Sequence, residues 1–399
     1  MAQSNTTGSA LVHLREALAQ RTGTRACDWH LVFKARYGMR EVFRTLREVR
    51  GEGCVVTTLF TGCTAADSIV ASGLAPAYAD IDPATLTVDA QALEVDENVR
   101  AVIVQHSYGM IDCAKTAACA AKAHAAGALL VEDSAHCVAR MARDAAGKPI
   151  ADISIHSMGI EKQLGVGFGG AIWVNPAMDD AGLYAALTRA FETLPPLPEK
   201  IDAAVRRYRN QNRVLAHLPR AVSGPARAHL AATGRLELPV ADMERRGRLP
   251  YPSYLPSEWI AQRILDGLSS LNEDEANRIA WTKGYLEALE GLNGIEIPEA
   301  ARTVAREQSL IRFPIVLPSE VAADPLIAEL RGSHLYCVDW YRMPFYPGAF
   351  ELAPYNMSED DPRYQGFFKR YGGIVGLPTD IDIARLPDAV EIVRRHIQA

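Results

Sequence analysis

Short apolar runs alternate with helical patterns between residues 54 and 131. Within this stretch Asp112 is suited to cap an alanine-rich helix that Gly127 ends. Apolar runs of this length, separated by helices of about a dozen residues, are typical of a mainly parallel sheet with helices on both faces. The sequence therefore predicts an α/β fold. The strand-like runs are Cys54–Thr57, Ala101–Val104 and Ala128–Val131, and the last of them leads into Glu132 and Asp133.

The remaining sequence predicts elements around this sheet. Residues 9–50 have a helical pattern, and residues 257–289 have the spacing of one long amphipathic helix. Residues 179–256 form a divergent, mostly helical and basic arm, for which a solvated or subunit-contacting arm and an anion site are both open. The pattern changes after this point, so we expect a large α/β domain over residues 1–289 and a smaller α+β domain over 290–399. In the smaller domain we expect strands at 310–316, 334–338 and 373–377, a helix at 321–330 and a last helix ending at 396.

Composition and charge exclude several classes of function. The net charge of -6 argues against a nucleic-acid groove. The first residues have no apolar core of a secretory signal, and no later apolar run is long enough to span a bilayer, so we expect a cytosolic protein that does not bind a membrane. The 7 cysteines form no Cys-x-x-Cys pair and show no metal-type spacing to a histidine. We therefore expect neither disulfides nor a metal site.

A lysine lies in an unusual context between two strand-like runs. Lys162 is followed by Gly165, Gly167, Gly169 and Gly170, so tightly turned backbone is expected to hold its amine close to the protein. A dinucleotide-binding loop is disfavoured, because a strand-like run follows these glycines where such a loop would open a helix. Two alternatives remain: a lysine that forms a Schiff base with an aldehyde cofactor, and a surface lysine on a loop.

Polar residues at the predicted strand ends favour the first alternative. Ligands of parallel sheets bind at the carboxyl ends of the strands, where His106, Asp133 and Lys162 all fall. A cofactor of the pyridoxal phosphate type needs a lysine, an acid for its ring nitrogen, a phosphate cradle and a group over the ring. Asp133 suits the acid, because pairing with a pyridinium at about 4 Å is worth on the order of 4 kcal/mol at an effective dielectric near 20. A helix-capping aspartate is the other interpretation.

Blocks that occur in a fixed order along the chain carry a family resemblance. These blocks are Phe60-Thr61, Ala65–Ile69, Asp80–Asp82, His106–Gly109, Glu132–His136, Asp152–Leu164, Gly169–Ile172, Pro256–Glu258 and Gly376–Thr379. Together they resemble the DegT/StrS family of pyridoxal-phosphate-dependent sugar aminotransferases, which have the type I aminotransferase fold. The resemblance spans most of the chain from about residue 50 onward, and the ordered set is more specific than any single block.

The resemblance implies roles for three residues at the expected cofactor site. Lys162 would form the Schiff base and later carry the proton between the substrate and the cofactor. Asp133 would hold the pyridine nitrogen, and His136 would hydrogen-bond near the phenolic oxygen. The resemblance also implies a homodimer in which each subunit completes the pocket of the other.

The same resemblance implies a phosphate cup, from which this chain departs in part. Ser157 matches a phosphate-binding serine, and Gly38 with Met39 matches a Gly-Thr pair whose amides cradle the phosphate at a helix N-terminus. The family's Ser-Gly-Thr is Tyr37-Gly-Met39 here, so two hydroxyl donors are missing. Arg36 or Arg40 is expected to compensate by charge.

Further departures concern the cofactor ring and the substrate. The family's aromatic residue after Thr61, which covers the ring, is Gly62 here. Phe60 or His136 is expected to take over the stacking; otherwise this ring face is open to an unusual substrate. An aromatic segment, 339–347, stands where the family has a substrate-contacting histidine, and it suits either substrate binding or domain packing. The expected substrate contacts are His106, Tyr108, Tyr341 and Arg342.

These observations predict an aminotransferase that moves an amino group from an amino acid donor, with glutamate expected, to a keto-sugar or related small ketone. Two other interpretations stay open, because fold and cofactor do not determine the reaction. One is another pyridoxal-phosphate reaction, such as a lyase, dehydratase or carbon–carbon bond-forming step. The other is a non-catalytic sensor or structural relative that has kept the fold.

Overall fold

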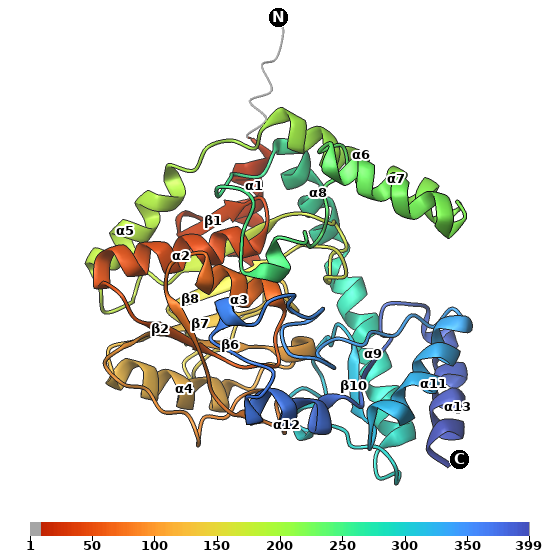
Figure 1. Ribbon diagram of the computed structural model, residues 1–399. Helices are drawn as coiled ribbons and strands as arrows, with labels where there is room; N and C mark the ends of the chain where they lie inside the picture. Colours follow the sequence, from red (N-terminus) through yellow and green to blue (C-terminus); the bar gives the residue numbers. More distant parts are fainter. Residues whose placement is uncertain (1–8, 399) are drawn as a thin grey trace, which may run out of the picture.

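The computed structural model describes residues 9–398 and centres on a seven-stranded sheet (Figure 1). The strand order is β1-β9-β8-β7-β6-β2-β3. Neighbouring strands from β8 to β3 are parallel, whereas β9 is antiparallel to β8 and β1 is antiparallel to β9. The predicted α/β fold with a mainly parallel sheet is confirmed. The strands are β1 (Trp29–Val32), β2 (Cys54–Thr57), β3 (Ala75–Tyr78), β6 (Val99–Gln105), β7 (Leu129–Asp133), β8 (Ile153–Ser157) and β9 (Gly170–Val174).

The two faces of the sheet are covered by different helices, because successive strand residues point to opposite sides. Ile103 packs with α2 (Ala35–Arg50), α3 (Cys63–Val70) and α5 (Ala181–Glu192) on one face. Its neighbours Val102 and Val104 pack with α4 (Cys113–Ala125) on the other. The two helix layers lie above and below the sheet in Figure 1. Consecutive residues of a central strand can therefore be apolar, as they are in Ala101–Val104.

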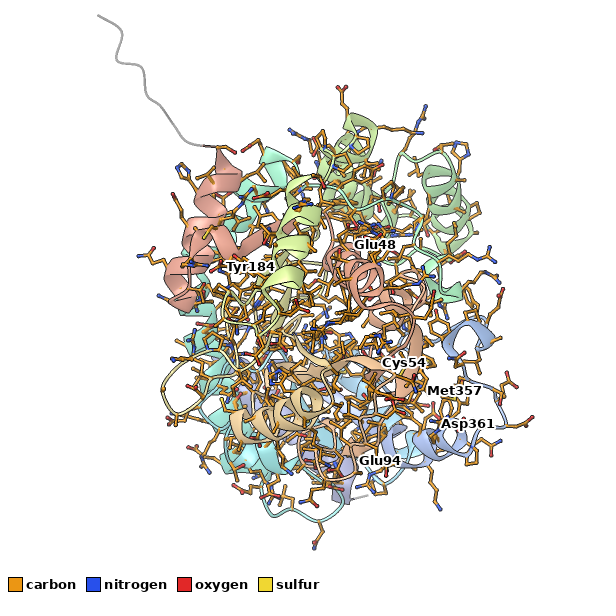
Figure 2. All side chains as sticks on the ribbon, turned by 90° about the vertical axis from the view of Figure 1, so that its left-hand side faces the viewer. Glu48, Cys54, Glu94, Tyr184, Met357 and Asp361 are labelled. Carbon is orange, nitrogen blue, oxygen red and sulfur yellow. The ribbon has the colours of Figure 1, made fainter. Side chains whose placement is uncertain are left out.

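Two helices extend this architecture at the edge of the sheet that β1 forms. The hydroxyl of Tyr184 on α5, labelled in Figure 2, donates a hydrogen bond of 2.8 Å to Asp28 just before β1. On the other side of β1, α1 (Ala10–Thr22) packs against α8 (Glu258–Ser269) and Trp29. These contacts bury the edge of the sheet on both faces.

Three sequence predictions of secondary structure are wrong. Residues 9–50 are not all helical, because β1 separates α1 from α2. The strand β1 is short: it has four residues, all of them buried, and within the described sheet it pairs with β9 alone. The predicted helix 257–289 breaks at Ser270, whose backbone (φ -100°, ψ 2°) leaves the helical region between α8 and α9 (Leu271–Leu289). Residues 334–338 are not a strand, since only Val338 forms a bridge, to Gly376.

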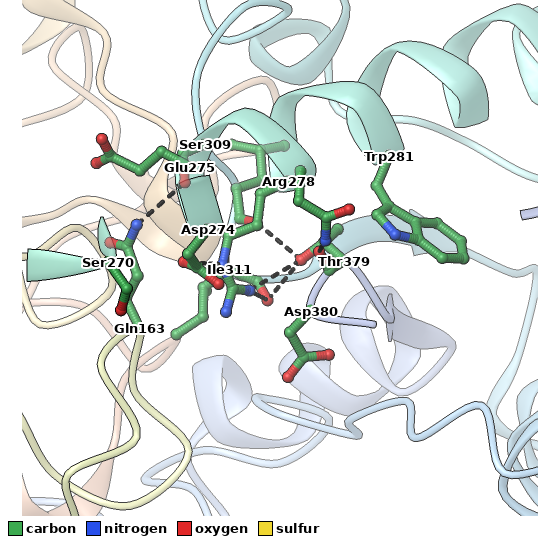
Figure 3. A network of polar contacts seen from close by, with 12 residues as sticks. Gln163, Ser270, Asp274, Glu275, Arg278, Trp281, Ser309, Ile311, Thr379 and Asp380 are labelled. Atoms are coloured by element: carbon green, nitrogen blue, oxygen red, sulfur yellow. Dashed lines mark hydrogen bonds and ion pairs between the residues drawn. The ribbon is translucent and has the colours of Figure 1, made fainter. Parts of the chain in front are cut away.

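The C-terminal elements pack around a second core. The antiparallel pair β10 (Phe313–Val316) and β11 (Ile374–Leu377) lies against α11 (Glu320–Gly332) and α13 (Leu386–Gln398). Helix α9 adds Trp281 and Tyr285 to this core, and α12 (Pro362–Tyr371) adds Phe367. The Arg278 guanidinium of α9 donates hydrogen bonds to the Ile311 carbonyl (3.0 Å) and to Thr379 Oγ1 (3.1 Å), as Figure 3 shows. The division into domains 1–289 and 290–399 stays a prediction.

The predicted basic arm contains α6 (Glu199–Ala216) and α7 (Arg220–Ala232), which project away from the sheet (Figure 1). None of the residues of α7 is buried. Residues 237–247, which follow α7, return to the sheet, where Glu237 and Glu244 are buried. Among the described residues, no helix has the length and apolar character that a membrane crossing requires.

Candidate active site

A cavity of about 460 Å³ opens at the carboxyl ends of β6, β7 and β8. Gln105, Asp133 and Ser157, the last residues of these strands, all line it. This is the edge of the sheet where parallel strands present their final side chains to a ligand. Lys162, His136 and Tyr341 line the same cavity, so the structure brings together residues that are far apart in the sequence.

The loop that carries Lys162 is held in place by its own backbone. The Lys162 amide donates a hydrogen bond to the Gly159 carbonyl, and Gly167 donates to Met158. Gly165, Gly167 and Gly169 all have positive φ angles, which glycine adopts without strain. The neighbouring Gln163 side chain donates to Ser309 Oγ at 3.1 Å (Figure 3). The loop therefore directs the lysine into the cavity rather than into solvent.

Burial and a carboxylate act in opposite directions on the Lys162 amine. Burial lowers the pKa of Lys162 to about 8, and the Asp133 carboxylate opposes this by favouring the charged amine. The Nζ atom lies 5.4 Å from the centre of the Trp340 ring. An amine with this pKa exists in both protonation states near neutral pH, which suits a group that accepts and returns a proton.

Asp133 ends β7 with its side chain directed into the cavity. The residue is only 5% exposed, and its Oδ1 accepts a hydrogen bond of 3.0 Å from the Ala135 amide. Burial raises the pKa of Asp133, while that backbone hydrogen bond and the Lys162 amine oppose the shift. The carboxylate is therefore poorly solvated and suited to pair with a cation that enters the cavity.

His136 is held as a neutral ring of defined tautomer. Its Nδ1 accepts a hydrogen bond of 3.1 Å from the Tyr108 amide, so the ring proton is on Nε2. The Nε2 atom lies 3.2 Å from the Tyr341 hydroxyl, to which it donates. Burial lowers the pKa of His136 well below its usual value. His136 can thus orient a neighbour by hydrogen bonding without carrying a charge.

The helix start that the sequence placed at Gly38 and Met39 lies one turn earlier. Helix α2 begins at Ala35, so the amides free to meet an anion are those of Ala35 and Arg36, both at the cavity. Gly38 instead packs on the sheet, where an added Cβ would lie 2.7 Å from Ile172 Cδ1. Met39 lines the cavity with its side chain, but its amide lies within the helix. The expected backbone role of Gly38 and Met39 is therefore corrected.

Two cations at this end of the cavity are paired with residues of the arm. The Lys34 amine is ion-paired with Glu237 (2.5 Å), and the Arg36 guanidinium is ion-paired with Glu244 (2.6 Å). Arg36 lines the cavity, and its compensation for the missing hydroxyls stays a prediction. Arg40 does not line the cavity and donates to the Tyr251 carbonyl and Ser253. The sequence analysis missed Lys34 and both glutamates, since no local pattern marks pairs that are some 200 residues apart.

Four other expected site residues lie outside the cavity. The His106 and Glu132 side chains are buried and hydrogen-bonded, with 2.7 Å between Nε2 and Oε2. The Tyr108 hydroxyl donates to the Trp340 carbonyl at 3.0 Å. Arg342 donates to the Gly372 carbonyl and pairs with Asp324. Phe60 is buried with its ring centre 4.8 Å from that of Tyr341. Tyr108 and Phe60 thus contact Trp340 and Tyr341, which line the cavity, whereas the side-chain partners of His106 and Arg342 lie outside it.

The pKa of Lys162 predicts a pH dependence of stability in the cofactor-free protein. The pKa is depressed from 10.5 to about 8 on folding, so the unfolded chain binds more protons between these values. The free energy of unfolding should therefore rise with pH across this window, by about 3 kcal/mol at about 1.4 kcal/mol per pKa unit. Urea unfolding of the wild type and of Lys162→Met at pH 8 and pH 10.5 measures this gain in stability, which the variant should lack. An identical gain in both proteins would assign the effect to other groups.

The architecture and the strand-end cavity that Lys162 lines define the class of the chain: it has the type I aminotransferase fold. The aminotransferase PseC of Helicobacter pylori, involved in the biosynthesis of pseudoaminic acid, superposes with a TM-score of 0.69 at 15% identity. That comparison covers 100% of this chain and 93% of that protein. Residues 9–183 match the sequence model of the DegT/DnrJ/EryC1/StrS aminotransferase family.

Two curated relatives match shorter parts. An L-glutamine:scyllo-inosose aminotransferase of Streptomyces griseus is 28% identical over 276 residues, which are 66% of this chain and 55% of the relative. A pleiotropic regulatory protein of Geobacillus stearothermophilus is 33% identical over 124 residues, which are 30% of this chain and 33% of the relative. The chain thus matches about half or less of the length of these relatives.

Proposed function

We propose that this protein is an aminotransferase that uses pyridoxal 5'-phosphate to move an amino group from an amino acid to a keto-sugar or related small ketone. The observation that carries this proposal is that Lys162 and Asp133 share one buried cavity at the sheet edge. The aminotransferases of the matched family use this cofactor. When bound, it withdraws electrons from the carbon that loses its proton.

The residues of the cavity fit the parts of such a cofactor. Asp133, poorly solvated and at a strand end, would hold the ring nitrogen as a cation. The free amides of Ala35 and Arg36, the Arg36 guanidinium and Ser157 would hold the phosphate. His136, whose Nε2–H donates to the Tyr341 hydroxyl, would lie near the ring oxygen. This assignment keeps the expected Ser157 and replaces Gly38 and Met39 with the first residues of α2.

Lys162 would act as the group that binds the cofactor and moves the proton. Its pKa of about 8 leaves a neutral amine available near physiological pH. We infer that glutamate or glutamine is the donor, since the Streptomyces griseus relative is named for glutamine. The protein would work in the cytosol as a homodimer.

A second candidate function is regulatory, and the similarity to a pleiotropic regulatory protein favours it. One experiment separates the two. Purified protein is loaded with pyridoxal 5'-phosphate, reduced with borohydride and mapped for the labelled lysine; unreduced protein is incubated with glutamate or glutamine and a panel of cyclic ketones. We expect label on Lys162. Without a ketone, at most one equivalent of the 2-oxo acid should be released per enzyme, whereas a ketone that accepts the amino group should regenerate the enzyme and allow release over many turnovers. Label with no turnover would favour the regulatory candidate.

A further inference from the structure

The cavity lacks a side chain at the position that follows Thr61. Gly62 lines the cavity, and the backbone of a segment from the C-terminal part is paired with it. The Tyr346 amide donates to the Thr61 carbonyl and the Cys63 amide donates to the Tyr346 carbonyl, both at 2.9 Å. These two hydrogen bonds hold the segment 340–347 against the cavity wall. Three aromatic residues of the segment line the cavity: Trp340, Tyr341 and Tyr346.

Tyr341 lines the cavity close enough to Asp133 for the two side chains to interact electrostatically. Its hydroxyl is 3.2 Å from His136 Nε2, and its ring rests on the buried Phe60 with centres 4.8 Å apart. Burial raises the pKa of Tyr341 and the nearby Asp133 carboxylate raises it further, so the phenol stays neutral. Its backbone has a φ of 63°, an uncommon conformation for a bulky residue that persists only where the surroundings hold it. The side chain is thus fixed in place from three sides.

Trp340 lies beside the lysine. Its ring centre is 5.4 Å from Lys162 Nζ and 5.0 Å from the centre of the His136 ring. Two consecutive aromatic residues therefore line the cavity that Lys162 and Asp133 share. A flat ring bound to both of these residues would occupy the same cavity as the Tyr341 side chain.

We propose that Tyr341, delivered by the segment 340–347, provides the aromatic surface that covers the cofactor ring in place of the side chain missing at Gly62. This inference rests on the proposed function and adds a residue to it: a side chain of the C-terminal segment that pairs with Gly62 would strengthen cofactor binding. Phe60 acts as a positioning residue, since it supports the Tyr341 ring without lining the cavity.

The test measures cofactor affinity rather than activity. The dissociation constant of pyridoxal 5'-phosphate is determined by equilibrium dialysis for the wild type, Tyr341→Leu and Tyr341→Phe. Loss of the aromatic face in Tyr341→Leu should raise the constant about tenfold. Tyr341→Phe keeps the ring and should retain most of the affinity. Phe367→Leu is the matched control, because Phe367 belongs to the same aromatic cluster but lies outside the cavity.

A restored aromatic side chain provides a second, independent measurement. Gly62 has a φ of -74°, and an added Cβ would meet Thr64 Oγ1 at 3.7 Å and the Tyr346 carbonyl at 3.8 Å, which are ordinary contacts. Gly62→Phe in the Tyr341→Leu background should therefore recover cofactor affinity. Borohydride labelling of each protein distinguishes the two hypotheses. If wild-type Lys162 is labelled and Tyr341→Leu binds as tightly, this inference alone is overturned; if wild-type Lys162 takes no label, the proposed function fails and the inference with it.

Discussion

Replacing Lys162 with alanine should lower the rate of amino transfer by about 10²–10⁴-fold, the range that a positioned acid–base group contributes. The reason is the pKa of about 8, which burial produces and which allows this amine to release and take up a proton near neutral pH. Single-turnover measurements on the cofactor-loaded variant with glutamate or glutamine report the proton transfer directly. The borohydride-dependent label on this peptide should disappear at the same time.

Two further variants separate proton transfer from electrostatics. Lys162→Arg keeps the positive charge, but a guanidinium with a pKa above about 12 does not release its proton, so this variant should be as slow as the alanine variant. Lys283→Ala removes an exposed lysine of α9 that pairs only with Glu307 and should leave the rate unchanged. A fast Lys162→Arg enzyme would contradict the role in proton transfer.

Replacing Asp133 with asparagine should slow the reaction about 10³-fold. The reason is that pairing between the carboxylate and a ring cation at about 4 Å is worth on the order of 4 kcal/mol at an effective dielectric near 20. Asparagine has nearly the same shape, and its carbonyl can still accept the hydrogen bond from the Ala135 amide. Single-turnover rates and the visible spectrum of the loaded variant measure the effect.

The stability of the cofactor-free Asp133→Asn variant tests the same assignment from another side. Folding raises the pKa of Asp133, so the folded protein holds this proton more tightly than the unfolded chain does. The protonated carboxyl therefore favours the folded state, and this contribution is lost as the pH rises through the pKa of Asp133 in the folded protein. At neutral pH the variant should therefore be at least as stable as the wild type in urea. A large loss of stability together with the loss of activity would indicate a structural role for Asp133 instead.

The sequence was informative where a few consecutive residues decide the geometry. Asp133 follows a run of apolar residues, and Lys162 precedes closely spaced glycines, so each could be placed at a strand end from its neighbours alone. The structure places both in one cavity. By contrast, adjacent strand residues point to opposite sides of a sheet. Thus Glu132 points to the side of the sheet opposite Asp133, where its carboxylate contacts the buried His106. The position of His106 at a strand end did not reveal this contact.

Contacts between distant segments could not be predicted in the same way. The periodicity of α2 does not mark its first residue, so the free amides were assigned to Gly38 and Met39 rather than to Ala35 and Arg36. The pairing of Arg36 with Glu244 and the contact of Tyr341 with His136 join residues more than 200 positions apart. Arg342 was expected to bind substrate as the neighbour of Tyr341, yet its side chain turns to Gly372 and Asp324.

By itself, the sequence determined the layered α/β architecture and the positions of the lysine and the aspartate, because apolar periodicity and glycine-rich turns act over short stretches of chain. Only the tertiary structure decided which side chains border the space between them, where the first free amides of α2 lie, and which charges are neutralised. These features depend on how the arm and the C-terminal segment pack against the sheet. Packing brings together residues that are far apart in the sequence, and no local pattern records which residues will meet.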